Sequence, residues 1–250
     1  MTIQAAATKS NKLIDEIFGL ISDGKKPDQF TLARIKSEIN KVLNVDAGNG
    51  HGLLGMFACL EADAELCKKH HKLAIQLTND VVDYINYTKS LIYLGQSNEA
   101  YQQIKKVLSV YPHNPDLIYL AIRTAIYSGH PDDVDDYYDA LNKIKPDMIN
   151  TEITYIRSLA KKFRQADISD EIASSLVKLA GGLILKNRLL TFSRNIFTDE
   201  TGSNIDIYYW IEINANPTKV VEMNIELCEQ IAADPYFCDK NTFSIAYQSK

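Results

Sequence analysis

The strongest constraint on the fold of this chain is a pair of consecutive 34-residue segments, residues 81–114 and 115–148, that align along their length. The clearest matching positions are Gly95 with Gly129, Val107 with Leu141, and Pro112 with Pro146. Each segment contains two short stretches with the hydrophobic spacing of a helix. A period of about 34 residues with two helices per unit is typical of helical hairpins that stack into a solenoid. The repeat therefore predicts a mostly α-helical scaffold suited to binding.

The same two segments resemble tetratricopeptide repeats. In the first segment the residues at the family's positions are Tyr84, Tyr87, Leu91, Ala100, Ile104 and Pro112. In the second segment they are Ile118, Ala121, Ala125, Val134, Tyr138 and Pro146. Thr88 departs from the glycine of the family pattern, and a fainter unit begins near His51, so that the resemblance covers roughly residues 48 to 148. The resemblance implies closely packed helix pairs that act as a scaffold for binding other proteins.

Further helices are expected on both sides of the repeat. They cover residues 6–22, 28–43, 150–164 and 167–185. The first two form an N-terminal capping hairpin in which Asp28 is placed as an N-cap, and residues 44–49 are rich in turn formers. Gly181–Gly182 interrupts the last helical pattern and is expected to end or bend that helix. The sequence thus predicts a helical array over residues 1–185.

The hydrophobic period changes after Leu189. Residues 191–199 and 204–214 are rich in aromatic and β-branched residues and flank a turn signal at residues 200–203, which predicts a β-hairpin. A helix over residues 217–233 and a short strand over residues 242–248 follow. The predicted fold is therefore a mostly α, tetratricopeptide-like helical-hairpin solenoid, followed by a small α/β (ββαβ) module over residues 186–250.

Charge and hydropathy narrow the function classes. The net charge is −5, and residues 165–250 hold 12 acidic and 7 basic side chains, against 20 of each before them. Nucleic-acid binding needs clustered Lys and Arg, so a protein partner with a basic surface is favoured instead. Apolar runs are shorter than the roughly 18 residues that cross a bilayer, and the first residues lack a signal-peptide pattern. We expect no membrane association and a cytoplasmic location, which also suits four cysteines without a CxxC pair.

Motifs for catalysis or cofactor binding are absent from the sequence. It contains no GxxxxGK[ST], GxGxxG, GxSxG or HExxH pattern. Cys67, His70 and His71 share one helix, with Cys59 on the preceding one, so a metal cluster is geometrically conceivable. Packing is the favoured interpretation, because close Cys or His pairs from two separate turns are missing. The sequence predicts no metal, no cofactor and no catalytic residue.

The most distinctive candidates for partner binding are acidic and aromatic. Five aspartates and a tyrosine lie at the start of the second helix of a repeat: Asp132, Asp133, Asp135, Asp136, Tyr137 and Asp139. Acidic residues near a helix N-terminus are stabilised by the helix dipole, which can explain the first of them without any partner. Trp210 and Glu212 lie on the second predicted strand. The alternatives for these residues are local stability or a contact surface for a basic partner.

Two functions from different classes follow. The first is a non-enzymatic interaction protein that binds and regulates or neutralises a partner protein, with an antidote to a basic toxin or nuclease as one specific version. The alternative is an enzyme with an active site in the C-terminal module and the array as substrate selector. Its polar residues would be Arg194, Asp199, Glu200, Asp206, Glu212 and Glu222. A cross-strand ion pair between Arg194 and Glu212 would explain two of these without catalysis.

Overall fold

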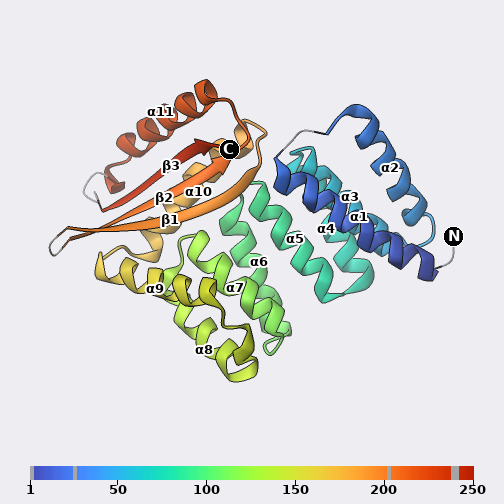
Figure 1. Cartoon of the computed structure of the whole chain (residues 1–250), viewed down its shortest axis with the longest axis horizontal. Helices are drawn as coiled ribbons and strands as arrows, with labels where there is room; N and C mark the ends of the chain where they lie inside the picture. Colours follow the sequence, from blue (N-terminus) through green and yellow to red (C-terminus); the bar gives the residue numbers. More distant parts are fainter. Residues whose placement is uncertain (1–2, 25–26, 202–203, 238–241) are drawn as a thin grey trace.

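The computed structural model of the chain describes residues 3–24, 27–201, 204–237 and 242–250. The helices are α1 (Ile3–Asp23), α2 (Gln29–Leu43), α3 (Ala47–Leu60), α4 (Ala64–Thr78), α5 (Val81–Tyr93), α6 (Ser97–Val110), α7 (Pro115–Tyr127), α8 (Val134–Ile144), α9 (Thr151–Gln165), α10 (Asp170–Lys186) and α11 (Pro217–Ala233). The strands are β1 (Thr191–Thr201), β2 (Asn204–Ile213) and β3 (Phe243–Ser249). The predicted architecture is confirmed: a mostly α chain with a small α/β module at its C-terminal end (Figure 1).

The repeat is visible as two equivalent helical hairpins, α5–α6 and α7–α8. The first helix of each is followed, two residues after its last residue, by a glycine, Gly95 or Gly129, with φ of +77° and +79°. This left-handed conformation suits glycine because it has no Cβ. Gly129 also lies against α10, since a Cβ there would come within 2.5 Å of the Ala173 carbonyl carbon. The matching glycines therefore both end helices and admit close packing.

Helix α10 runs without interruption through Gly181–Gly182, so a helix end at these glycines is wrong. A Cβ on Gly181 would lie 2.1 Å from the carbonyl oxygen of Gly95. The glycine is therefore needed for the close crossing of α10 over the turn between α5 and α6. Packing, rather than helix termination, accounts for it.

Two capping aspartates set the starts of helices near the N-terminus. Asp28 accepts a hydrogen bond from the Thr31 amide at 2.8 Å, which confirms its predicted role as N-cap of α2. Asp46 accepts one from the Asn49 amide at 3.0 Å and starts α3 at Ala47. The turn expected over residues 44–49 is therefore shorter than predicted, because its later residues form the first turn of a helix.

The sheet has the order β1-β2-β3, with β1 and β2 antiparallel and β2 and β3 parallel. Helix α11 makes the crossover between the two parallel strands, which confirms the predicted ββαβ order. Two residues of the predicted hairpin turn, 202 and 203, lie outside the described residues. On α11, the Asn224 amide accepts from the Tyr247 N–H at 2.8 Å and donates to its carbonyl at 3.0 Å. The free edge of β3 is thereby covered.

One face of the sheet packs on the helical array. The largest hydrophobic cluster takes residues from α6 to α11 and from all three strands, so the core continues across residue 186. Tyrosine hydroxyls of β2 and β3 reinforce this contact by donating to backbone carbonyls of the array. Tyr209 bonds Tyr127 at 2.7 Å, and Tyr247 bonds Ala180 at 2.6 Å. The array thus fixes the sheet in place and leaves its other face open.

Candidate functional site

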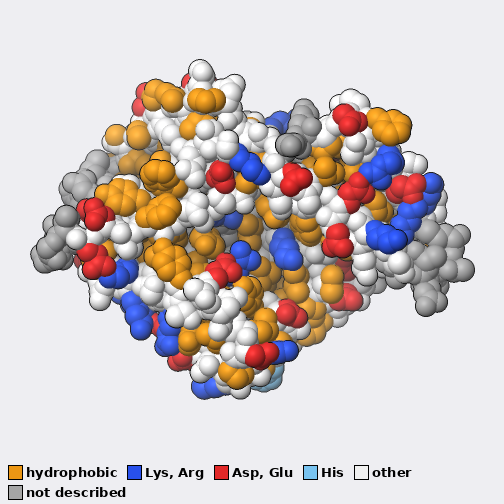
Figure 2. Space-filling model, in the orientation of Figure 1, with side chains coloured by type: hydrophobic (Ala, Val, Ile, Leu, Met, Phe, Trp, Pro, Cys, Tyr) orange, Lys and Arg blue, Asp and Glu red, His pale blue; other side chains and the backbone are white. Residues whose placement is uncertain are grey.

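The open side of the sheet, here called the outer face, is made of alternate residues of the three strands. These are Ser193, Asn195, Phe197 and Asp199 of β1, Asp206, Tyr208, Trp210 and Glu212 of β2, and Ser244, Ala246 and Gln248 of β3. None of these positions holds Lys or Arg. Figure 2 shows hydrophobic side chains gathered over the sheet on the side turned to the viewer.

Three aromatic side chains form the centre of the outer face. Phe197 is 49% exposed, Tyr208 36% and Trp210 44%. The register places Phe197 directly opposite Tyr208, and the rings of Phe197 and Trp210 meet edge to face with centroids 5.9 Å apart. Neighbouring rings of this kind shield one another only in part from water. The result is an exposed aromatic patch on a rigid sheet.

Carboxylates lie at both ends of this aromatic patch. Asp199 and Asp206 face each other across β1 and β2, and neither forms an ion pair with any described residue. At the other end, Glu212 accepts a hydrogen bond from the Ser193 hydroxyl at 2.8 Å. Two of the predicted contact residues, Trp210 and Glu212, are therefore brought together here. Tyr208 joins them by alternation along β2, and Phe197 joins them through the strand register, which the sequence did not reveal.

The aspartate-rich segment over residues 132–139, here called the α8 segment, spans a 3-10 turn and the start of α8, and cations of the same chain pair with it. Asp135 pairs with Arg157 at 2.7 Å and Arg164 at 2.5 Å, and Arg157 also reaches Asp139 at 3.4 Å. Asp133 accepts from the Tyr101 hydroxyl and pairs with Lys105 at 3.2 Å. These contacts join α8 to α6 and α9. Much of the charge that singled out this segment in the sequence is therefore balanced inside the molecule.

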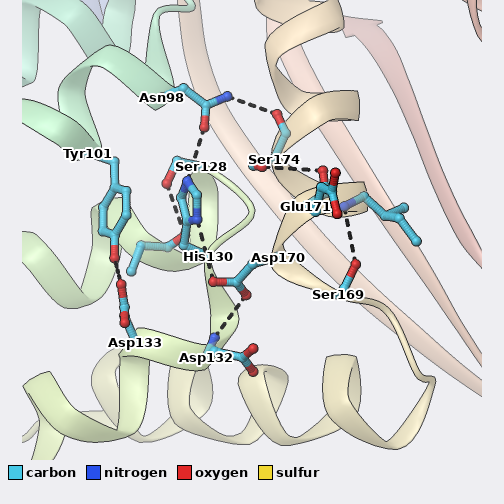
Figure 3. A network of polar contacts seen from close by, with 12 residues as sticks. Asn98, Tyr101, Ser128, His130, Asp132, Asp133, Ser169, Asp170, Glu171 and Ser174 are labelled. Atoms are coloured by element: carbon cyan, nitrogen blue, oxygen red, sulfur yellow. Dashed lines mark hydrogen bonds and ion pairs between the residues drawn. The ribbon is translucent and has the colours of Figure 1, made fainter. Parts of the chain in front are cut away.

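The first turn of the segment also contacts α10 (Figure 3). Asp170 accepts from the Asp132 amide at 3.2 Å and lies 3.5 Å from the His130 ring nitrogen. Partial burial, with the nearby charges of Asp170 and Asp136, raises the pKa of Asp133. The side chains of Asp132, Asp136 and Asp139 stay exposed, and Tyr137 is half-buried. The segment therefore combines an internal network with a partly exposed acidic edge.

Partial burial acts to raise the pKa of Asp135, but Arg157 and Arg164 outweigh it and hold the pKa below its ordinary value. Their hydrogen bonds and positive charges favour the ionised carboxylate. Asp133 and Asp135, only two positions apart, thus have pKa values shifted in opposite directions. The two ion pairs of Asp135 account for the lowering of its pKa.

Three of the four residues considered for a metal cluster pack together in the core. Cys59, Cys67 and His71 are buried together, and the His71 Nε2 lies 3.0 Å from the Ser90 hydroxyl. The hydrogen bond with Cys59 lowers the pKa of Cys67 to about 6, against the opposing effect of burial. His70 instead faces His51, with Nδ1 atoms 3.1 Å apart. Within the described parts of the chain, no three His, Cys, Asp or Glu residues are arranged to hold a metal ion.

The residues of the enzyme alternative are spread over both sides of the sheet. Arg194 pairs in register with Ile211, whereas Glu212 pairs with Ser193. Neighbouring strand positions point to opposite faces, so the suggested ion pair between Arg194 and Glu212 does not form. Glu200 pairs with Lys162 of α9. The structure therefore brings Asp199 and Asp206 together, and separates Arg194 from Glu212.

No protein-family model, curated protein or solved structure shows significant similarity to this chain. The likeness to tetratricopeptide repeats therefore remains one of residues at matching positions. Within the described residues, none of the helices combines the length and apolar character needed to cross a bilayer.

Proposed function

We propose that this protein is a non-catalytic binding protein, and that the outer face of its sheet receives a basic segment of a partner protein. The observation that carries the proposal is the patch of Phe197, Tyr208 and Trp210 between unpaired Asp199 and Asp206 at one end and Glu212 at the other. Exposed aromatic residues on a rigid surface suit protein interfaces, because their rings bury a large area at small entropic cost.

The chemistry of the outer face favours Arg and Lys in the partner. A cation over an aromatic ring gains about 0.5 to 2 kcal/mol, and the indole of Trp is the best acceptor. Asp199 and Asp206 repel each other while they lack a cation, so a basic side chain between them relieves an existing cost. Negative charge also steers a basic partner and speeds its association.

The α8 segment is the weaker candidate for the main contact. Asp135 already has two arginine partners, and a new cation would have to compete with them. Its exposed members, Asp132, Asp136 and Asp139, would add long-range attraction. A regulator or inhibitor that masks a basic surface, such as an antidote to a basic toxin or nuclease, is the specific form of the proposal that this charge distribution supports.

The fluorescence of Trp210 provides the test, because it is the only tryptophan of the chain. A synthetic peptide of alternating Arg and Leu is titrated into the protein, with a Glu/Leu peptide of equal length as comparison. We expect the Arg/Leu peptide to shift Trp210 emission to the blue and to bind more weakly as salt is added. Failure of the Arg/Leu peptide to change the emission at low salt would contradict the proposal.

A matched pair of triple variants locates the contact. Asp199→Asn, Asp206→Asn and Glu212→Gln together remove three charges from the outer face and should weaken peptide binding about tenfold. Asp132→Asn, Asp136→Asn and Asp139→Asn remove three charges from α8 and the turn before it and should change the affinity about twofold or less. Equal losses from both triple variants would show general electrostatic attraction and would remove the outer face from the argument.

A further inference from the structure

A cavity of about 440 Å³ lies between the helical array and the first strand. Its walls come from α1, α5, the first residue of α6, α7 and the start of β1. Figure 2 shows basic side chains in the hollow at the middle of the molecule, between α5 and the sheet. A volume of this size suits a small organic ligand, for which pockets of about 300 to 1,000 Å³ are typical. The cavity is separate from the aromatic patch, because Phe197, Tyr208 and Trp210 do not line it.

The repeat itself builds one wall of the cavity. Lys89 and Arg123 are 34 residues apart and occupy the same position in the two units, as do Tyr93 and Tyr127. All four line the cavity. Because equivalent residues of stacked repeats point the same way, the solenoid presents a cation and a phenol ring twice in succession. The alignment of the two units already pairs these residues, and the structure adds that they line the same cavity.

The C-terminal module supplies the third cation, Arg194 of β1. Its guanidinium donates to the Ile92 carbonyl at the end of α5 and, at 2.8 Å, to the Thr191 hydroxyl. These bonds hold the half-buried side chain at the cavity wall. Arg194 forms no ion pair with any carboxylate in the described part of the chain. A guanidinium has five donors, so donors remain for another acceptor.

Positive charge in the cavity has no matching negative charge in its lining, which contains no Asp or Glu. Arg123 pairs at 2.8 Å with Glu152 of α9, which lies outside the lining. Lys89 makes no ion pair with a described carboxylate, and its ammonium lies 5.7 Å from the Phe18 ring centroid. Burial, with the charge of Arg123, lowers the pKa of Lys89 and of Arg194. Lys89 and Arg123 are exposed at the cavity and Arg194 is half-buried, so all three cations are within reach of a ligand. A hollow lined by charges of one sign attracts the opposite charge, which favours an anion.

We propose that this cavity binds a small organic anion, a phosphate or carboxylate group joined to an apolar body. Lys89, Arg123 and Arg194 hold the oxyanion, and the rings of Phe18 and Tyr127 contact the apolar body. Arginine suits the first task because its planar guanidinium donates two parallel hydrogen bonds to such a group. The site lies where the array meets the module, so the ligand would contact both parts of the chain at once.

Calorimetric titration of the full chain tests the site with three probes. Phenyl phosphate carries both the anion and the ring, inorganic phosphate carries the anion alone, and benzyl alcohol carries the ring alone. We expect phenyl phosphate to bind at least about tenfold more tightly than either of the others, since both kinds of contact contribute. No detectable binding of phenyl phosphate at about 10 mM, a concentration at which even weak sites of millimolar Kd are occupied, would overturn the proposal.

Variants decide whether binding occurs in the cavity. Lys89→Gln and Arg123→Gln should each weaken the binding of phenyl phosphate about tenfold, because each removes one charge-assisted contact. The double variant removes both contacts and should bind more weakly than either single variant. Lys105→Gln on α6, outside the lining, is the matched control and should leave the affinity unchanged. Arg194→Gln is measured after these variants, because Arg194 also joins β1 to α5 and its loss would disturb that contact as well. Equal binding by the double variant and the native chain would place the probe elsewhere and refute the site.

This proposal and the proposed function fail separately. The double variant Asp199→Asn/Asp206→Asn changes neither a lining residue nor a hydrogen-bond partner of one, so it should bind phenyl phosphate like the native chain. Loss of phenyl phosphate binding in that variant would refute the assignment to the cavity. Conversely, a peptide that fails to change Trp210 emission says nothing against the cavity, which Trp210 does not line.

Discussion

The two faces of the sheet are made of alternate residues of the same strands, yet one is covered by helices and the other by nothing in the described chain. On β2, Tyr209 is 1% exposed and its neighbour Trp210 is 44% exposed. The inner residues contribute burial and hydrogen bonds to the array, whereas the outer residues contribute little that folding requires. Because side chains alternate along a strand, adjacent positions can serve different ends, here burial in the core and exposure on the outer face.

The largest expected effect separates these two faces directly. Tyr209→Ala removes a ring from the core together with its hydrogen bond to the Tyr127 carbonyl, and should lower the free energy of unfolding by about 3 to 5 kcal/mol. Trp210→Ala removes a larger ring from the neighbouring position and should cost about 1 kcal/mol or less, chiefly its contact with Phe197. Urea unfolding followed by circular dichroism measures both.

The reverse order would break the comparison. If Trp210→Ala destabilised the chain as much as Tyr209→Ala, the outer face would belong to the core and could not be kept for a partner. Tyr209→Phe refines the result, because it keeps the ring and removes only the hydroxyl. Its expected cost is about 1 kcal/mol, the usual contribution of a single hydrogen bond.

An intermediate change in stability is expected at Asp135. This carboxylate has ion-pair partners, so it can be compared with Asp199 and Asp206 of the outer face, which have none among the described residues. Asp135→Asn should lower the free energy of unfolding by about 1 kcal/mol at pH 7, a modest value because solvent screens the partly exposed pair. Its pKa is held below the ordinary 3.8, so the native carboxylate contributes stability above that pH. This contribution is lost as the pH falls through the lowered pKa.

Urea unfolding of Asp135→Asn and the native chain at several pH values checks the sign. The difference between them should be constant near neutral pH, shrink as the pH drops below about 3.8, and vanish at still lower pH. Asp199→Asn is the control, since its carboxylate has no ion-pair partner among the described residues and should show no such loss of stability. A difference that grew on acidification would contradict the assigned ion pairs.

The architecture could be predicted from the sequence because it depends on local signals. The 34-residue period, the N-cap at Asp28 and the change to alternating aromatic residues after Leu189 are each readable over a few turns or a few strand residues. The glycine pair at 181–182 was misread because its reason is not local: Gly181 faces Gly95, 86 residues earlier. Propensity indicated a break where packing required a small residue.

The candidate site was less predictable for the same reason. The run of aspartates on α8 is obvious in the sequence, but its partners Arg157 and Arg164 lie on the next hairpin and their ion pairs appear only in three dimensions. Trp210 and Glu212 were identifiable by residue type, whereas Phe197 joins them through strand register. A charge run in a sequence therefore says little about free charge until its neighbours across the fold are known.

The smallest expected effect concerns the unpaired carboxylates themselves. Asp199 and Asp206 lie directly opposite each other on the outer face, and like charges in such cross-strand positions are destabilising. Asp206→Asn should therefore raise the free energy of unfolding by about 0.3 kcal/mol at low ionic strength. The gain should disappear in about 1 M salt, where the screening length falls to about 3 Å.

Glu212→Gln is the matched control on the same strand and the same face. It also removes one negative charge, but Glu212 accepts a hydrogen bond from Ser193 and has no carboxylate directly opposite, so no gain is expected. Stabilisation by Asp206→Asn but not by Glu212→Gln would show that the fold tolerates a specific repulsion on the face it leaves uncovered. A loss of stability in Asp206→Asn would instead mean that this carboxylate has a structural role, and the outer face would then lose its strongest claim to a basic partner.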